Sequence, residues 1–253
     1  MQRYFLEIAY KGTAYKGFQK QPNALTIQGE VEHALQILFQ QNINLTGSSR
    51  TDAGVHALQN FFHFDTDIAV QSKHLYNLNA ILPQDIVVKN VAPVSMQAHC
   101  RFSATSREYT YYIYRVKNPF LKDRAYYYPY QLDLELLQQA AQVLFTYTNF
   151  ITFSKRNTQV KTFDCTIMAA KWSTTYDQVI FNVSANRFLR GMVRGLVGTM
   201  LHVGRGIVSI DDFKNIIESK DCSKADFSVP PQGLFLSAVN YPEMMWKDDI
   251  GNC

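Results

Sequence analysis

The N-terminal part of the chain alternates between apolar and polar residues and then changes to a helical spacing. Residues 3–10 place tyrosine, leucine and isoleucine side chains on one side, which is the period-two pattern of a strand. Residues 27–39 repeat apolar side chains every three or four positions, which predicts an amphipathic helix with Thr26 as its N-cap. Gly12 and Gly17 mark the connection between the two as a loop.

Further alternating and helical stretches follow in an order typical of a mixed fold. The pattern predicts a Phe-rich strand at 60–65, a short helix at 73–81 ended by Pro83, and a strand at 85–94. The first hundred residues are therefore strand, helix, loop, strand, helix and strand. This order indicates compact α/β or α+β architecture.

The second part of the chain repeats this order of elements. The expected elements are a tyrosine-rich strand at 107–116, a helix at 133–145, strands at 161–172 and 179–183, helices at 187–202 and 209–219, and a strand at 233–240. We therefore expect two similar subdomains, residues 1–105 and 106–253. The longest of these helices would align Arg187, Arg190 and Arg194 along one edge.

The stretch from Thr46 to Ala57 joins the first helix to the Phe-rich strand and carries one acid, Asp52. Its glycines and serines mark it as a loop. An acid in a loop between ordered elements is typical of a catalytic position, because loops carry groups that meet ligands. Asp-Ala-Gly is equally an ordinary turn sequence, in which the aspartate accepts local backbone hydrogen bonds.

Charge adds a class of partner to this picture. The formal net charge is +4, and the cations gather in residues 1–20, 101–126 and 187–205. Clustered basic segments are typical of a surface that binds a polyanion such as a nucleic acid. Each segment taken alone is also compatible with a solvated basic face.

Cysteine usage and hydropathy argue against several other classes. The four cysteines include no C-x-x-C pair, so a zinc site is not expected. No apolar run approaches the roughly 18 residues that a membrane span needs. The first ten residues alternate and lack the apolar core of a signal peptide. We therefore expect a reduced, cytoplasmic protein.

Six blocks of the sequence, in order, resemble the tRNA pseudouridine synthase A family over nearly the whole chain. The blocks are residues 10–22, 26–30, 50–57, 102–109, 188–194 and 230–236. The most specific is Arg50-Thr-Asp-Ala-Gly-Val-His-Ala57, which is similar to the catalytic loop of that family. Any one block can arise by chance, whereas six in the same order identify a relationship.

The resemblance implies a fold and a reaction. It implies an α+β fold whose two α/β-type subdomains share one continuous, mixed, mostly antiparallel sheet, with helices on one face and a basic active-site cleft between them. The implied activity is that of an isomerase that converts uridine to pseudouridine at nucleotides 38 to 40 of the tRNA anticodon stem-loop. The resemblance implies no cofactor and no metal. It also implies a homodimer in which one tRNA contacts both subunits.

The resemblance also implies catalytic roles. Asp52 matches the nucleophile, and a carboxylate is both nucleophilic and a competent leaving group. Tyr109 matches the tyrosine that stacks on the target base and helps to remove its C5 proton. Arg194 matches a basic residue that keeps the desolvated Asp52 ionised. The alternatives are a core tyrosine at 109 and a solvated helix arginine at 194.

Substrate-binding candidates are mostly basic. Arg50 either holds the phosphate of the flipped nucleotide as a bidentate donor or forms a structural ion pair. Tyr109 also contributes to binding through its ring. His56 is better explained as a packed, hydrogen-bonded histidine than as a general acid. The remaining candidates for phosphate contacts are Lys11, Lys16, Lys20, Arg101, Arg107 and Arg190.

Three positions depart from the family pattern. Ser49 stands where glycine is usual, and would cost on the order of 1 kcal/mol if the backbone there needs positive φ. Phe18 replaces the usual tryptophan and Phe235 the usual tyrosine. Both keep an aromatic ring and lose its polar group.

Other functions remain open at this stage. A non-catalytic module that binds structured RNA would carry the same basic and aromatic residues. An isomerase acting on a different RNA would also share them. A two-carboxylate hydrolase is disfavoured, because the nearest second acid, Glu108, adjoins Tyr109 on the opposite face of the strand.

Overall fold

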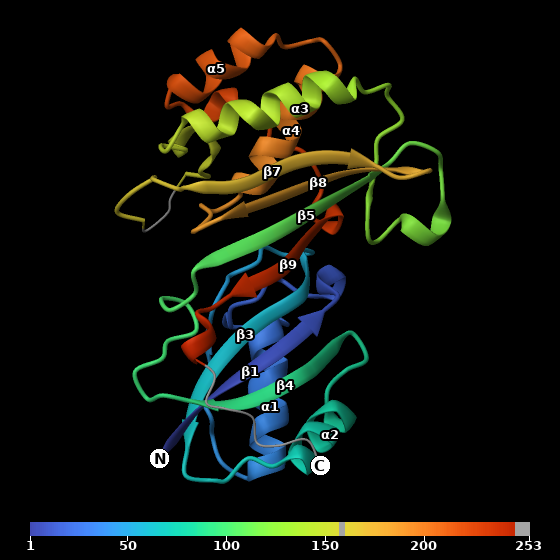
Figure 1. The fold of residues 1–253 in the computed structure, drawn as a ribbon. Coiled ribbons are helices and arrows are strands. Elements are labelled where there is room, and N and C mark those ends of the chain that lie inside the picture. Colours follow the sequence, from blue (N-terminus) through green and yellow to red (C-terminus); the bar gives the residue numbers. More distant parts are fainter. Residues whose placement is uncertain (157–159, 246–253) are drawn as a thin grey trace. The chain divides into compact units, whose positions relative to one another are not determined.

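The chain folds into two compact units. A computed structural model describes residues 1–156 and 160–245. Unit 1 contains Met1–Thr105 and the described residues from Leu236 onward, and unit 2 contains Ser106–Phe235 (Figure 1). The predicted subdomains placed all residues after 105 in the second part, so the division differs at the end of the chain. The reason is local pairing: the amide of Val239 donates to the Gln59 side chain at 3.0 Å.

The sheet of unit 1 is built around its first strand. β1 (Gln2–Tyr10) pairs antiparallel with β3 (His56–Thr66) on one side and with β4 (Ile86–Val94) on the other. The short β2 (Thr46–Gly47) pairs antiparallel with β3. In the strand order, β9 (Leu234–Asn240) follows β3. The strand at 60–65 expected from the sequence is therefore longer, because its pairing with β1 begins at Ala57.

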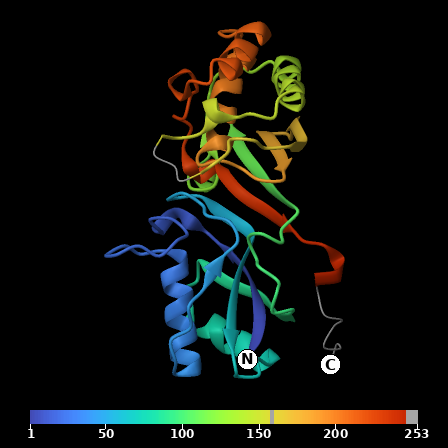
Figure 2. The ribbon, with the colours of Figure 1, turned by 90° about the vertical axis from the view of Figure 1, so that its left-hand side faces the viewer.

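Two helices cover the strands of this unit. α1 (Ile27–Phe39) lies against one face of them (Figure 2), and α2 (Ser72–Ile81) packs beside α1 and β4. α1 has the predicted bounds because two signals agree at its start. The Thr26 hydroxyl accepts a hydrogen bond from the Gly29 amide at 3.3 Å, and the apolar stripe beginning at Ile27 is buried.

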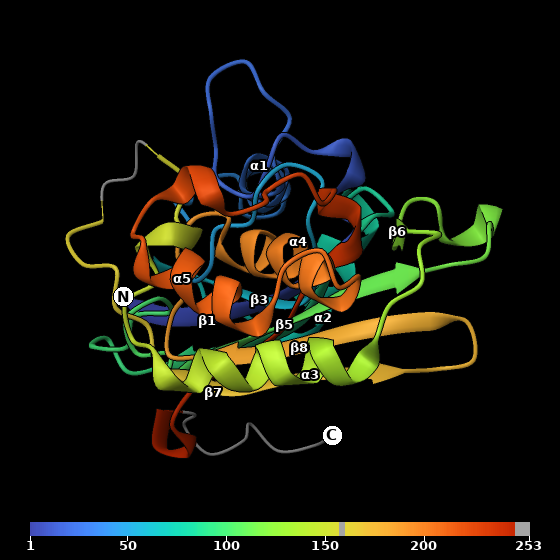
Figure 3. The ribbon, with the colours of Figure 1, turned by 90° about the horizontal axis from the view of Figure 1, so that it is seen from above.

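Unit 2 has a separate set of strands and helices. β5 (Ser106–Tyr114) and β7 (Ile167–Thr174) each pair antiparallel with β8 (Gln178–Ala185), and the short β6 (Tyr126–Tyr127) runs parallel to β5. The helices are α3 (Leu134–Val143), α4 (Met192–Gly204) and α5 (Ile210–Glu218), which pack on one another on one side of these strands (Figure 3). The predicted α+β fold with mixed, mostly antiparallel strand pairing is confirmed.

The long helix of unit 2 begins later than the sequence predicted. Gly191 is its N-cap and has φ of +76°, a left-handed conformation that glycine adopts without steric cost. Arg187 and Arg190 therefore precede the helix. The prediction that these two arginines and Arg194 line one helix edge is wrong, since only Arg194 is on α4. The apolar spacing that suggested an earlier start continues through a turn, not through a helix.

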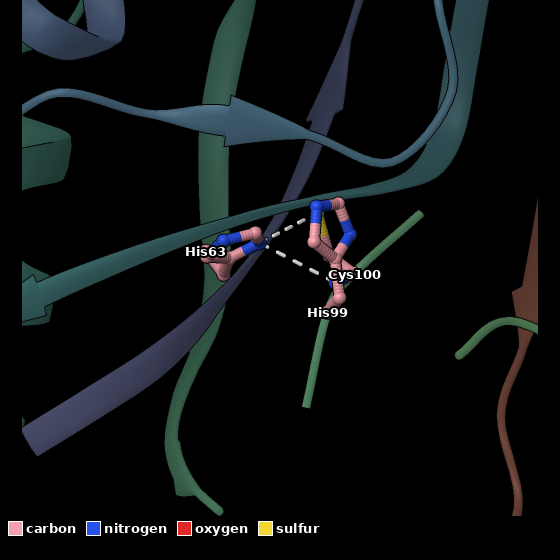
Figure 4. A group of neighbouring side chains, drawn as sticks. All are labelled: His63, His99 and Cys100. Atoms are coloured by element: carbon pink, nitrogen blue, oxygen red, sulfur yellow. Dashed lines mark hydrogen bonds between the residues drawn. The ribbon is translucent and has the colours of Figure 1, made fainter. Parts of the chain in front are cut away.

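A buried polar cluster joins β3 to the segment before β5. His63 Nδ1 lies 3.1 Å from the Cys100 sulfur and 3.3 Å from the Cys100 amide (Figure 4). The His99 ring packs edge-on against His63, with centroids 4.6 Å apart. The Arg3 guanidinium, paired with Asp65 at 2.7 Å, lies near both rings.

This cluster sets the charge of His63. Burial and the nearby Arg3 charge lower the pKa of His63 from 6.5 to about 4. Between these two values the unfolded chain binds a proton that the folded chain excludes. The contribution of His63 to stability is therefore complete above pH 6.5 and is lost as the pH falls toward 4.

We expect His63→Gln to weaken the pH dependence of stability. The free energy of unfolding, measured by urea denaturation at pH 7 and pH 5, should fall less on acidification in the variant than in the wild type. Cys100→Ser keeps the histidine and serves as the control that retains the wild-type loss. An equal loss in His63→Gln and the wild type would contradict the assignment.

Candidate active site

The Asp52 loop connects β2 to β3 and is a tight turn. The Val55 amide donates to the Asp52 carbonyl at 3.2 Å, and Gly54 has φ of +78°. The Asp52 side chain is half-buried. The two interpretations of this stretch are therefore compatible: Asp-Ala-Gly forms an ordinary turn, and that turn presents a carboxylate.

A buried hydrogen-bond network connects the loop to β1 and β3. Asn60, fully buried on β3, donates to the Ser49 carbonyl at 2.9 Å and to the Tyr10 hydroxyl at 3.3 Å. That hydroxyl lies 2.7 Å from the Thr51 hydroxyl. The residues on both sides of Arg50 are thus held, and Asp52 follows directly. The supporting roles of Tyr10 and Asn60 were not predicted; the available signal was an asparagine directly before an aromatic run.

The connection after β1 lies directly against the same loop. A Cβ on Gly12 would be 1.9 Å from the Val55 carbonyl oxygen, so only glycine fits there. The Gly12 amide donates to His56 Nδ1 at 3.0 Å, and the Phe18 amide donates to the Thr51 carbonyl at 3.1 Å. His56 is buried, which confirms it as a packed, hydrogen-bonded histidine.

The departures near the loop are accommodated without strain. Ser49 is not among the described residues with positive φ, so the cost considered for it does not arise. Phe18 is buried and stacks on Phe62 with centroids 4.7 Å apart. A Cβ on Gly47 would lie 2.3 Å from the Phe18 ring. The phenylalanine therefore fills its site.

The Asp52 carboxylate forms no ion pair with the described residues of its own unit. Among the described residues of unit 1, no cation lies within ion-pair distance of the Asp52 carboxylate. Arg50 is exposed and forms no ion pair with any described residue. The structural ion pair considered for Arg50 is therefore wrong. A role in phosphate binding stays a prediction.

The lysines and arginines predicted to contact phosphates differ in their surroundings. Lys11 and Lys16 are exposed, and Lys20 forms an ion pair with Glu32 at 2.7 Å. The Arg101 guanidinium lies over the ring of the exposed Phe102, 5.5 Å from its centre. In unit 2, Arg107 donates to the Asn186 carbonyl at 2.9 Å and Arg190 is exposed.

Tyr109 lies on β5 in unit 2 and is half-buried. Its ring is edge-on to Phe188, with centroids 5.1 Å apart and an interplanar angle of 85°. Tyr111, two residues on, is fully buried and donates to the Pro230 carbonyl at 2.7 Å. The core interpretation therefore applies to Tyr111, while Tyr109 keeps part of its surface exposed.

Arg194 lies in the first turn of α4 and is fixed by main-chain oxygens. Its Nε donates to the Val229 carbonyl at 2.7 Å and its Nη2 to the Phe227 carbonyl at 3.3 Å. The side chain is half-buried, so the solvated helix arginine considered from the sequence is wrong. No described residue forms an ion pair with it. The guanidinium is thus held in place without a carboxylate partner among the residues that the structure describes.

One described group has the donor types of a metal site, namely His63, His99 and Cys100. Its ligand atoms lie within 4.8 Å of one another. The two imidazoles already accept backbone hydrogen bonds at Nδ1, His63 from Cys100 and His99 from Arg101 at 3.1 Å. The neighbouring Arg3 charge further disfavours a cation there.

Among the helices that the structure describes, none has the length and apolar character of a membrane span.

Comparison with known proteins assigns a family to this arrangement. The sequence profile described as tRNA pseudouridine synthase matches residues 8–103 and 140–242. Asp52 and Arg194 lie inside the matched ranges, and Tyr109 lies between them.

Three relatives carry the name tRNA pseudouridine synthase A. The protein of Parabacteroides distasonis is 46% identical over 248 residues, covering 97% of this chain and 98% of the relative. That of Bacteroides fragilis is 45% identical, with coverage of 98% and 99%. That of Staphylococcus aureus is 35% identical, with coverage of 99% and 96%. The chain therefore belongs to the tRNA pseudouridine synthase family.

Proposed function

We propose that this chain isomerises uridine to pseudouridine at nucleotides 38 to 40 of the tRNA anticodon stem-loop, with Asp52 as the nucleophile. The observation that carries the proposal is the support of the Asp52 loop. A half-buried carboxylate on a turn fixed by Tyr10, Thr51 and Asn60 is held in one place. A nucleophile needs this positioning, because well-oriented groups react far faster than free ones.

The reaction rearranges bonds within one nucleotide. The bond between ribose C1′ and N1 of uracil breaks, the base rotates, and C1′ bonds to C5. The C5 proton leaves and N1 gains a proton, so the atoms balance without an oxidant or reductant. The Asp52 carboxylate adds to C6 or to C1′ and later departs. The nucleotide must first leave the stack, which costs a few kcal/mol.

Tyr109 and Arg194 are proposed to act on the same nucleotide as Asp52. The half-exposed Tyr109 ring, supported edge-on by Phe188, offers a face on which the uracil stacks and a phenol near its C5 proton. Arg194 carries a charge that no described residue neutralises. That charge favours the ionised form of a desolvated carboxylate.

Seven lysines and arginines, all exposed except the half-buried Arg107, are proposed to bind the tRNA backbone. Arg50, next to Thr51 on the Asp52 loop, is placed to hold the phosphate of the flipped nucleotide. Lys20 contributes less, because Glu32 already pairs with it. The other proposed phosphate contacts are Lys11, Lys16, Arg101, Arg107 and Arg190. We further propose that a homodimer in the cytoplasm binds one tRNA with both subunits.

We expect Asp52→Asn to abolish pseudouridine formation while tRNA binding persists. The amide keeps the size of the side chain but is not a nucleophile. Pseudouridine should be mapped in total tRNA from cells lacking this protein, with wild type or variant added back. Binding is measured by filter retention of the anticodon stem-loop.

Three outcomes of that experiment separate the candidate functions. Tight binding by the wild type with unmodified uridines 38 to 40 would support the non-catalytic module. Modification at other sites would support an isomerase of different specificity. Turnover by Asp52→Asn near the wild-type rate would end the assignment of the nucleophile.

Tyr109 should separate into two functions when it is substituted. Tyr109→Phe keeps the ring and should retain KM while kcat falls by about 10² or more, because it loses the phenol that moves the proton. Tyr109→Leu loses both and should also raise KM. Tyr176→Leu, at a fully exposed tyrosine, is the control. An unchanged kcat in Tyr109→Phe would remove the proton-transfer role.

Arg50→Gln should raise KM for tRNA by about tenfold and reduce the salt dependence of binding by about one phosphate contact. Arg50→Lys keeps the charge and should recover part of the loss, because the bidentate geometry is absent. Lys73→Gln, at an exposed lysine of α2, is the control. A salt dependence unchanged by Arg50→Gln would exclude a phosphate contact.

A further inference from the structure

The segment that holds Arg194 is Asp226–Val229, called here the carbonyl segment. Two of its carbonyl oxygens, those of Phe227 and Val229, accept the Arg194 hydrogen bonds. The direction of the guanidinium therefore depends on where this segment lies. The inference that follows rests on the proposed function, in which Arg194 serves catalysis.

The buried side chain of Thr199 on α4 bonds the first residue of the carbonyl segment. The Thr199 hydroxyl accepts a hydrogen bond from the Asp226 amide at 3.0 Å and donates to the Gly195 carbonyl at 2.8 Å. Thr199 is 2% exposed. Helical threonines often bond only the carbonyl four residues earlier. This one also satisfies the amide that begins the carbonyl segment.

Close packing leaves the segment little freedom. A Cβ on Gly198 would lie 2.2 Å from the Asp226 carbonyl oxygen, and one on Gly195 would lie 2.8 Å from the Phe227 ring. The Asp226 carboxylate accepts from the Ser228 amide at 2.7 Å. Its other oxygen lies 3.1 Å from His202 Nε2. The helix and the segment therefore fit each other in one arrangement.

We propose that Thr199 is a positioning residue that sets the guanidinium of Arg194 through the carbonyl segment. The chain of contacts runs from the Thr199 hydroxyl to the Asp226 amide, and then to the Phe227 and Val229 carbonyls and Arg194. Thr199 itself contacts no substrate in this assignment. A displacement of about 1 Å at a positioning group costs up to about 100-fold in rate.

Thr199→Val tests the proposal with little change in shape. It removes the acceptor for the Asp226 amide, and the single-turnover rate with saturating enzyme should fall about tenfold with tRNA affinity unchanged. Thr199→Ser restores the hydroxyl and should recover the rate. Asp226→Ala removes the carboxylate that contacts the Ser228 amide and His202, and it should reproduce the loss even if Thr199→Val fails to fold.

The matched control is Thr152→Val in the same unit. Thr152 is also buried and donates to the Ile217 carbonyl at 3.0 Å. Its loss should lower the melting temperature without changing the single-turnover rate. A general loss of packing would instead slow both variants alike, and that result would overturn the positioning role.

A double-mutant cycle with Arg194→Lys decides the route of the effect. If Thr199 acts through Arg194, Thr199→Val should slow the Arg194→Lys enzyme by less than twofold. An equal slowing in both backgrounds would overturn the inference and leave the proposed function intact. An Arg194→Lys enzyme with the wild-type rate would show that the direction of the guanidinium does not matter, which would also overturn the inference and leave the charge of residue 194 in the proposed function.

Discussion

The Asp52 loop depends on the hydrogen bonds that Asn60 donates to Ser49 and Tyr10, and on the one between the Tyr10 and Thr51 hydroxyls. Buried polar groups are costly unless each finds a partner. These groups are satisfied only when the loop, the end of β1 and β3 are in register. The network therefore selects one loop conformation, and the carboxylate at its tip follows. An acid on an unsupported loop would have to lose that freedom each time it reacted.

The cation of unit 2 is held by a different kind of contact. Main-chain carbonyls orient the Arg194 guanidinium, whereas a carboxylate partner would orient it and also neutralise it. Carbonyl oxygens carry only partial charge, so the side chain is fixed with its full charge available. Tyr109 is half-buried, and its ring is nearly perpendicular to that of Phe188.

The sequence predicted elements best where two independent signals coincide. α1 has its predicted bounds because an N-cap and an apolar stripe mark the same start. The start of α4 was predicted five residues too early, because Leu189 continues the apolar spacing of the helix. The Arg190 carbonyl instead accepts a hydrogen bond from the Lys155 amide, which is distant in the sequence and which no sequence pattern reveals. The motifs pointed to Asp52 and Arg194, whose catalytic roles stay predictions. The residues that support the Asp52 loop were not predicted, because Tyr10 and Asn60 are 50 residues apart in the chain.

Gly191 has a consequence for the two residues of unit 2 that are proposed to act in catalysis. It separates Phe188, which braces Tyr109, from Arg194, which carries the charge. The φ of +76° at Gly191 sets the direction of the chain between Phe188 and Arg194. A β-carbon there would meet the Lys155 side chain at 3.0 Å and strain the backbone. A change at Gly191 would therefore disturb aromatic stacking and charge in concert, although glycine itself has no side chain to offer the substrate.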